Sequence, residues 1–248
     1  MPELDYDHVE EKIVNWLRNQ VKDCGMEGCV VGLSGGIDSA VTSVLCKKAF
    51  PDNTLGVIMP CYSGQEDGKD ARKIADKFNI EYISKDLTPV LDEFLYVLEG
   101  KKDYEANMEI ANMKPRLRMV TLYYYAAKNN YLVIGTDNWS ELKVGYFTKH
   151  GDGGVDIAPL GRLVKTEVRE LAGHLGIPEK IINKPPSAGL WEGQTDEAEM
   201  GISYEVLDNY ILTGKASQEK QEKIEDMSRK NSHKLDPIPM PDRADLRK

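Results

Sequence analysis

The sequence lacks long apolar runs and C-x-x-C pairs. No segment approaches the roughly 18–20 apolar residues that span a bilayer, and the acidic first residues contain no apolar core of a secretory signal. The 248 residues include only four cysteines. We therefore expect a cytoplasmic chain with no membrane association and with free thiols.

Basic residues are also scarce, since 32 Lys and Arg stand against 41 Asp and Glu, a formal net charge of −9. A duplex nucleic-acid binder usually carries a basic footprint, so we expect no nucleic-acid partner. Small anionic substrates remain compatible, because they need only a locally positive pocket. The composition is globular and the length suits one domain. We expect a single domain over residues 1–248, with a proline-containing tail from about 231 that becomes ordered only against a ligand.

Four short apolar runs alternate with segments of helical periodicity. The expected strands are 29–33, 55–59, 80–84 and 132–135. The expected helices are 6–21, 38–48, 65–78, 88–98, 104–128 with an interruption near Pro115, 165–175, 204–212 and 217–230. This order predicts an α/β fold, a doubly wound open parallel sheet with helices on both faces. Ligands of such sheets bind at the carboxyl ends of the strands. Segment 184–195, rich in Pro, Gly and Ser, is expected to be an ordered loop or a lid.

The segment L-S-G-G-I-D-S at 33–39 joins the first strand to the next helix. Its glycines let the backbone approach an anion, and the helix start supplies free N–H groups. Asp38 would repel a phosphate unless a cation such as Mg²⁺ bridged the two. The chain contains neither a Walker loop nor G-x-G-x-x-G. The segment instead resembles the S-G-G-x-D-S pyrophosphate loop of the N-type ATP pyrophosphatases, which cleave ATP to AMP and pyrophosphate.

Residues 32–36 also fit G-x-S-x-G, the nucleophile elbow of serine hydrolases, and histidines follow at 150, 174 and 233. Two features weigh against this alternative. No earlier strand or H-G-G-G segment supplies a second oxyanion donor, and Asp38 and Ser39 are left without a purpose. Labelling of Ser34 by an acyl probe would support the hydrolase.

Three downstream blocks narrow the choice: G-T-D-N-W-S-E at 135–141, G-Y-F-T-K-H-G-D-G-G-V-D at 145–156 and G-Q-T-D-E at 193–197. With the loop, they make nearly the whole chain resemble the ammonia-dependent NAD⁺ synthetases, whose fold is adenine nucleotide alpha hydrolase-like. The resemblance implies that ATP adenylates the nicotinate carboxylate of deamido-NAD⁺ and that ammonia then displaces AMP to give NAD⁺. It also implies a homodimer with the dinucleotide site at the subunit interface. No amidase domain is evident, so free ammonia is the expected donor, and a separate glutaminase remains an open alternative.

The resemblance also implies roles for individual residues. Asp38 and Glu141 match Mg²⁺ ligands, and Asp38 and Lys165 match catalytic positions. The residues that match ATP contacts are Gly32, Leu33, Ser34, Gly35, Gly36, Ile37, Asp38, Ser39, Thr136, Lys165 and Ser187. The residues that match deamido-NAD⁺ contacts are Arg116, Lys149, Asp156, His233 and Lys234.

The chain departs from the family pattern at two positions. Gly189 stands where many members have Asp, and Leu235 stands where many have Arg. Two other functions stay open on the same loop: a ligase with another acceptor, such as a GMP synthetase-like or tRNA-modifying enzyme, and a non-catalytic nucleotide-binding module. The tRNA-directed enzymes usually need a basic face, and a module has no need for the Asp38 and Glu141 pair.

Overall fold

The computed structural model describes residues 4–101, 107–187, 195–243 and 245–246. Its sheet has four parallel strands in the order β3-β2-β1-β4. The strands are β1 (Gly28–Gly32), β2 (Thr54–Ile58), β3 (Glu81–Ser84) and β4 (Tyr131–Ile134). Val30 in β1 lies opposite Leu55 in β2 and Val133 in β4. The four expected strands are confirmed, with boundaries shifted by about one residue.

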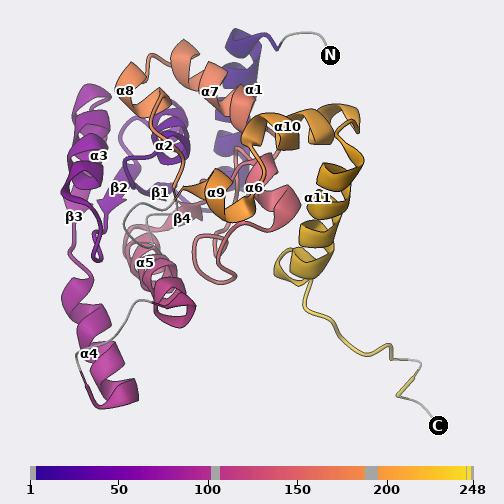
Figure 1. Cartoon of the computed structure of the whole chain (residues 1–248). Coiled ribbons are helices and arrows are strands. Elements are labelled where there is room, and N and C mark those ends of the chain that lie inside the picture. The colour runs from indigo at the N-terminus through magenta and orange to yellow at the C-terminus, as the bar shows by residue number, and fades with distance from the viewer. Residues whose placement is uncertain (1–3, 102–106, 188–194, 244, 247–248) are drawn as a thin grey trace.

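Helices surround this sheet (Figure 1). Those of the first half are α1 (Tyr6–Asp23), α2 (Ile37–Ala49), α3 (Gln65–Lys77), α4 (Thr88–Glu99) and α5 (Met108–Asn129). Those of the second half are α6 (Trp139–Val144), α7 (Lys165–His174), α8 (Glu179–Ile182), α9 (Asp196–Met200), α10 (Tyr204–Thr213), α11 (Gln218–Asn231) and the 3₁₀ turn η1 (Ser232–Lys234). The sequence did not predict α6, α8 and α9, which are only four to six residues long and too short to show a period.

Helices pack on both faces of the sheet. On one face, Cys29 and Val31 of β1 lie in a core with α1, α2 and α7. On the other, Val30 and Val133 lie in a core with α4 and α5. The doubly wound arrangement is therefore confirmed. No helix of the described residues is both long and apolar enough to cross a bilayer, and all four cysteines are free thiols, as expected.

Helix α5 corrects one expectation, because it runs from Met108 to Asn129 without the interruption predicted near Pro115. A proline inside a helix removes one main-chain hydrogen bond and usually kinks the helix or ends it. Here Pro115 is buried and packs closely against Gly151 in a neighbouring loop. Helix α5 also packs on β1 and β4, so tertiary contacts outweigh the local cost. The predicted start at residue 104 lies outside the described residues.

The strand order creates a switch point between β1 and β4. From β1 the chain moves outward through β2 to β3, then returns to place β4 on the other side of β1. Crevices at the carboxyl ends of such strands are where open α/β sheets bind ligands. Loop 33–36 leaves β1 at this point, and Thr136 follows β4 beside it. A third core of α6, α10 and α11 packs next to this region, and the tail beyond η1 extends away from the body (Figure 1).

A substitution at the contact between α6 and α11 tests this packing. Gly145 caps α6 with a φ of +66°, and a Cβ added there would lie 2.3 Å from the Cβ of Asn231. We expect Gly145→Ala to lower the free energy of unfolding by about 1–3 kcal/mol, because it adds both a clash and backbone strain. Equilibrium urea unfolding measures this loss.

Gly173→Ala is the matched control. Gly173 lies inside α7, and nothing is within 4 Å of its Cβ position. Alanine there should raise the free energy of unfolding by about 0.5–1 kcal/mol, since it restricts the unfolded chain. Similar effects of the two substitutions would contradict the close contact between Gly145 and Asn231.

Candidate functional site

The loop between β1 and α2 is a preformed backbone cradle. The Ser34 and Ser39 hydroxyls lie 3.0 Å apart, Ser39 Oγ donates to the Gly36 carbonyl, and the Gly36 N–H donates to Ser34 Oγ. Gly35 has a φ of +82°, and a Cβ there would lie 2.3 Å from the Asp67 carbonyl oxygen. Helix α2 then begins without a side-chain cap, so its first N–H groups remain available to an anion.

Three charged side chains from distant positions meet beside this loop. Lys165 Nζ lies 2.5 Å from Asp38 Oδ2 and 3.1 Å from Glu141 Oε1. Asp38 is in the first turn of α2, Glu141 is in α6 after β4, and Lys165 begins α7. The structure therefore brings together both residues predicted to bind metal and the lysine predicted to contact ATP.

Burial controls the protonation of this cluster. Burial raises the pKa of Glu141 to about 7, although Lys165 opposes the shift. Burial lowers the pKa of Lys165, but Asp38 and Glu141 more than offset this and hold it above its ordinary value. Lys165 thus stays an ammonium at neutral pH, at 1% exposure.

Residues that the sequence did not single out hold the cluster in place. The side-chain oxygen of Asn138 accepts from the Glu141 backbone N–H, and the Asn138 backbone N–H donates to Glu141 Oε2. The side-chain amide of Asn138 also donates to Asp38 Oδ1 at 2.9 Å. The N-x-x-E spacing of this capping box was a usable signal.

Buried Asp208 accepts from Ser140 Oγ at 2.5 Å and from the Thr166 N–H at 2.7 Å, while Ser140 accepts from the Lys165 N–H. No local pattern relates Asp208 to the start of α7.

Asp137 adds a further buried carboxyl group to the segment between β4 and α6. It is 8% exposed, and burial raises its pKa well above the ordinary value, with further contributions from Asp152, Glu141 and Asp38. Asp152 belongs to the 145–156 block and Asp38 to the pyrophosphate-type loop. The pKa of Asp137 therefore responds to carboxylates of both motifs.

Four of the five residues predicted to contact the dinucleotide lie together. Arg116 donates to the Lys149 carbonyl at 3.4 Å, and the Lys149 ammonium donates to the His233 carbonyl. Lys234 Nζ donates to the carbonyls of Gly145 at 2.6 Å and Phe147 at 2.8 Å. Within the described residues, none of these three cations forms an ion pair with a carboxylate. Their charge is therefore available to an anionic ligand.

The remaining predicted residues have different surroundings. Asp156 accepts from Tyr123 OH at 3.0 Å and from the Val133 N–H at 2.8 Å. It therefore binds the edge of β4 to α5. Thr136 is half-buried directly after β4. Ser187 is exposed at the last described residue before segment 188–194. Gly189, and with it most of the predicted lid, lies outside the described residues.

Lys184 is a further cation that sequence reasoning missed. Its Nζ lies 2.7 Å from Asp67 Oδ1, 3.3 Å from Asp70 Oδ2 and 3.5 Å from the Gly35 carbonyl oxygen. The contacts tie the segment before Ser187 to α3 and to the pyrophosphate-type loop.

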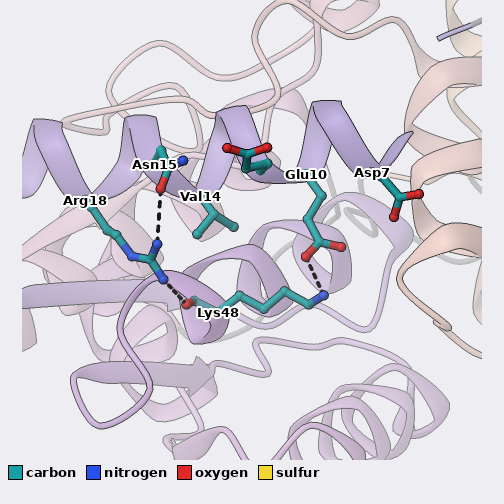
Figure 2. A pocket seen from close by; sticks show the side chains of 7 residues that line it. Asp7, Glu10, Val14, Asn15, Arg18 and Lys48 are labelled. Atoms are coloured by element: carbon teal, nitrogen blue, oxygen red, sulfur yellow. Dashed lines mark hydrogen bonds and ion pairs between the residues drawn. The ribbon is translucent and has the colours of Figure 1, made fainter. Parts of the chain in front are cut away.

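A hollow of about 390 Å³ lies elsewhere, between α1 and the end of α2 (Figure 2). Lys48 pairs there with Glu10 at 2.6 Å, and Arg18 donates to Asn15 and to the Lys48 carbonyl. Lys48 is in the last turn of the 13-residue α2, so the hollow is about one helix length, roughly 20 Å, from the cluster. The hollow is therefore not part of the site.

The donors at the cluster fit a hard divalent cation. Asp38 and Glu141 supply carboxylate oxygens within reach of one central atom, as the shared ammonium demonstrates. Mg²⁺ characteristically takes one or two carboxylates and completes its octahedron with substrate phosphates and water. No group of three or more His, Cys, Asp or Glu in the described part of the chain forms a metal cage. The protein therefore offers a partial site that suits a metal bound to a nucleotide.

Tyr204 links this cluster to α9. It is fully buried, and its hydroxyl lies 3.2 Å from Glu141 Oε1 and 3.1 Å from Asp196 Oδ2. We expect Tyr204→Phe to lower the free energy of unfolding by about 1–3 kcal/mol, because a buried carboxylate loses a donor. Urea unfolding at neutral pH measures the change.

Tyr210→Phe in the same helix is the control. Its hydroxyl bonds Glu225 at 2.8 Å on the exposed surface, where such contacts contribute less than about 1 kcal/mol. Equal losses for the two variants would show that the Tyr204 hydroxyl has no special role.

Comparison with known proteins agrees with this geometry. The family model described as NAD synthase matches residues 9–238. An NH₃-dependent NAD⁺ synthetase of Carboxydothermus hydrogenoformans is 52% identical over 96% of this chain and 99% of its own.

Two solved structures superpose on nearly the whole chain. A structure of NMN synthetase from Francisella tularensis matches with a TM-score of 0.91 and 38% identity, over 96% of this chain and 99% of its own. An NH₃-dependent NAD synthetase from Campylobacter jejuni matches with a TM-score of 0.79 and 31% identity, over 96% and 100%. By sequence and by structure, the chain belongs to the NAD synthase family.

Proposed function

We propose that this chain is an ammonia-dependent NAD⁺ synthetase, a ligase that converts deamido-NAD⁺ to NAD⁺ with ATP as the last step of NAD⁺ biosynthesis. The observation that carries the proposal is the meeting of Asp38, Glu141 and Lys165 beside the S-G-G-I-D-S loop. The matches to curated NH₃-dependent NAD⁺ synthetases over nearly their whole length support it. We propose a single synthetase domain over residues 1–248, acting in the cytoplasm.

The reaction joins two anionic substrates. A carboxylate oxygen of deamido-NAD⁺ attacks the α-phosphorus of ATP, the bond from that phosphorus to the β-phosphate bridging oxygen breaks, and pyrophosphate leaves. The nitrogen of ammonia then attacks the activated carbonyl carbon, AMP leaves, and nitrogen loses a proton. We assign the pyrophosphate to the N–H groups of loop 34–39 and the first turn of α2. We assign Lys165 to the phosphates, and Thr136 and Ser187 to the rest of ATP.

The dinucleotide needs a second positive surface. We assign its phosphates and carboxylate to Arg116, Lys149 and Lys234, which donate to backbone carbonyls and form no ion pair with a carboxylate among the described residues. His233 adds a ring nitrogen beside them, and Asp156 accepts from hydroxyl groups at the edge of β4. In a chain with a net charge of −9, this local reversal favours association with polyanions.

Asp38 and Glu141 would hold Mg²⁺. When bound, the metal supplies charge neutralisation at the phosphates during displacement of pyrophosphate. The neighbouring Asn138 amide and Tyr204 hydroxyl orient the two carboxylates before substrate arrives. Hydrogen bonds that orient metal ligands in this way typically raise the affinity for the metal.

Product stoichiometry tests the function. With ATP, Mg²⁺, deamido-NAD⁺ and ammonium, we expect equal amounts of pyrophosphate and NAD⁺, and no NAD⁺ if any one component is omitted. Asp38→Asn should lower kcat/KM by roughly 100-fold or more, because a charged metal ligand is lost. Asp76→Asn, at an exposed position of α3, is the matched control and should leave it unchanged. ATP binding without pyrophosphate release would favour a nucleotide-binding module.

The similarity to an NMN synthetase raises a second candidate, a mononucleotide acceptor. The same assay with nicotinate mononucleotide in place of deamido-NAD⁺ separates the two. We expect kcat/KM to favour the dinucleotide by at least about tenfold, a difference of about 1.4 kcal/mol. A higher kcat/KM for the mononucleotide would show that the shorter molecule is the acceptor.

We propose that the chain forms a homodimer through α5. Arg116, Val120 and Tyr124 follow each other at a spacing of four, so they share one exposed face, and the last two are 61% and 62% exposed. An apolar surface next to a residue assigned to the dinucleotide suits a subunit interface at that site.

Light scattering coupled to size exclusion tests this assembly. Val120→Glu should convert a dimer to a monomer and raise the KM for deamido-NAD⁺, because a charge in a buried interface is costly. Val97→Glu on α4, at 73% exposure, is the control and should remain dimeric. A wild-type monomer would overturn the proposed assembly.

A further inference from the structure

The ammonium of Lys165 occupies the position between the two carboxylates assigned to the metal. Its Nζ lies 2.5 Å from Asp38 Oδ2 and 3.1 Å from Glu141 Oε1, and the lysine side chain is only 2% exposed. A divalent cation that bridged the same oxygens would need nearly the same point in space. Lysine and metal therefore cannot both bridge these two oxygens.

The surroundings keep the lysine in this position. Its backbone N–H donates to Ser140 Oγ at 3.0 Å, and its ammonium lies 5.0 Å from the centre of the Tyr204 ring. Asn138 donates to Asp38 and Tyr204 contacts Glu141, so each carboxylate also has a neutral partner. The aromatic ring adds favourable cation–π energy. Before ligand binds, the Lys165 ammonium is therefore the cation that pairs with both carboxylates.

The protein alone offers a metal too few ligands to displace this lysine. Asp38 and Glu141 are two carboxylates, and no third His, Cys, Asp or Glu in the described segments joins them as a metal ligand. A free Mg²⁺ would have to remove the ammonium, lose water and leave a buried positive charge without a partner. ATP removes this obstacle, because its phosphates supply further oxygen ligands and also accept the ammonium.

We propose that Lys165 is the resident cation of the metal site. Its ammonium holds Asp38 and Glu141 together until a nucleotide–metal complex binds. The ammonium then moves to the phosphates, and the metal binds the two carboxylates. The inference rests on the proposed function, since it assigns ATP as the partner. It gives Lys165 two successive roles, and it makes entry of the metal conditional on the nucleotide.

Binding of Mn²⁺, followed by the electron paramagnetic resonance of the free ion, tests this exchange without catalysis. Nucleotide-free wild-type protein should bind Mn²⁺ at least about tenfold more weakly than Lys165→Met, because methionine leaves two buried carboxylates without a cation. Adding an ATP analogue with a methylene group between its α- and β-phosphorus atoms should create tight Mn²⁺ binding in the wild type. Lys48→Met is the matched control, since Lys48 pairs with Glu10 outside the site, and it should behave as wild type.

Two results would overturn the exchange. One is Mn²⁺ affinity of Lys165→Met no higher than wild type. The other is tight binding by the nucleotide-free wild type that Asp38→Asn abolishes. The second measurement needs no substitution at Lys165, so the inference stays testable if that variant does not fold. If the NAD⁺ assay fails but Mn²⁺ binding follows the expected pattern, deamido-NAD⁺ is not the acceptor and the exchange at Lys165 stands. If NAD⁺ is formed but Mn²⁺ binding does not follow that pattern, only the exchange is contradicted.

Discussion

Two carboxylates and one ammonium must meet below the surface, because none of the three could stay charged there alone. Removing one partner of a buried ion pair typically costs about 3–5 kcal/mol. Asp38, Glu141 and Lys165 come from the starts of α2, α6 and α7, so their pairing requires those three helices to begin at the same point. The strand order satisfies this requirement, since β1 and β4 are neighbours and both end there. The position of α7 is then set by a second layer, in which Ser140 and Asp208 receive the first N–H groups of the helix.

The sequence predicted those parts of this arrangement whose causes are local. Each strand is a short apolar run, and the S-G-G-I-D-S loop carries its conformation in its own glycines, as the φ of Gly35 illustrates. The placement of Asp38 and Glu141 at one sheet edge followed from the general rule for parallel strands. The capping box of Asn138 and Glu141 also has a local cause, its N-x-x-E spacing.

The parts that could not be predicted depend on contacts across the fold. Pro115 should have interrupted α5 by its local chemistry, but packing against Gly151 and the sheet keeps the helix continuous. Tyr204 lies 63 positions from Glu141 and Asp208 lies 68 from Ser140, and no periodicity relates such residues. Asp156 matched a substrate contact by its motif, yet here it also holds β4 through the Val133 N–H. One position can therefore satisfy both a family motif and a structural need.

The cations of the site are held in two different ways, and the difference matters for what each can do. Arg116, Lys149 and Lys234 donate to backbone carbonyls, which orient an ammonium or guanidinium without forming an ion pair with it. Lys165 instead pairs with carboxylates, so its charge is cancelled until another anion competes for it. The first arrangement presents a constant positive surface that a dinucleotide can meet at any time. The second can respond only to a ligand that brings phosphate and metal together, because either one alone would leave a buried charge unpaired.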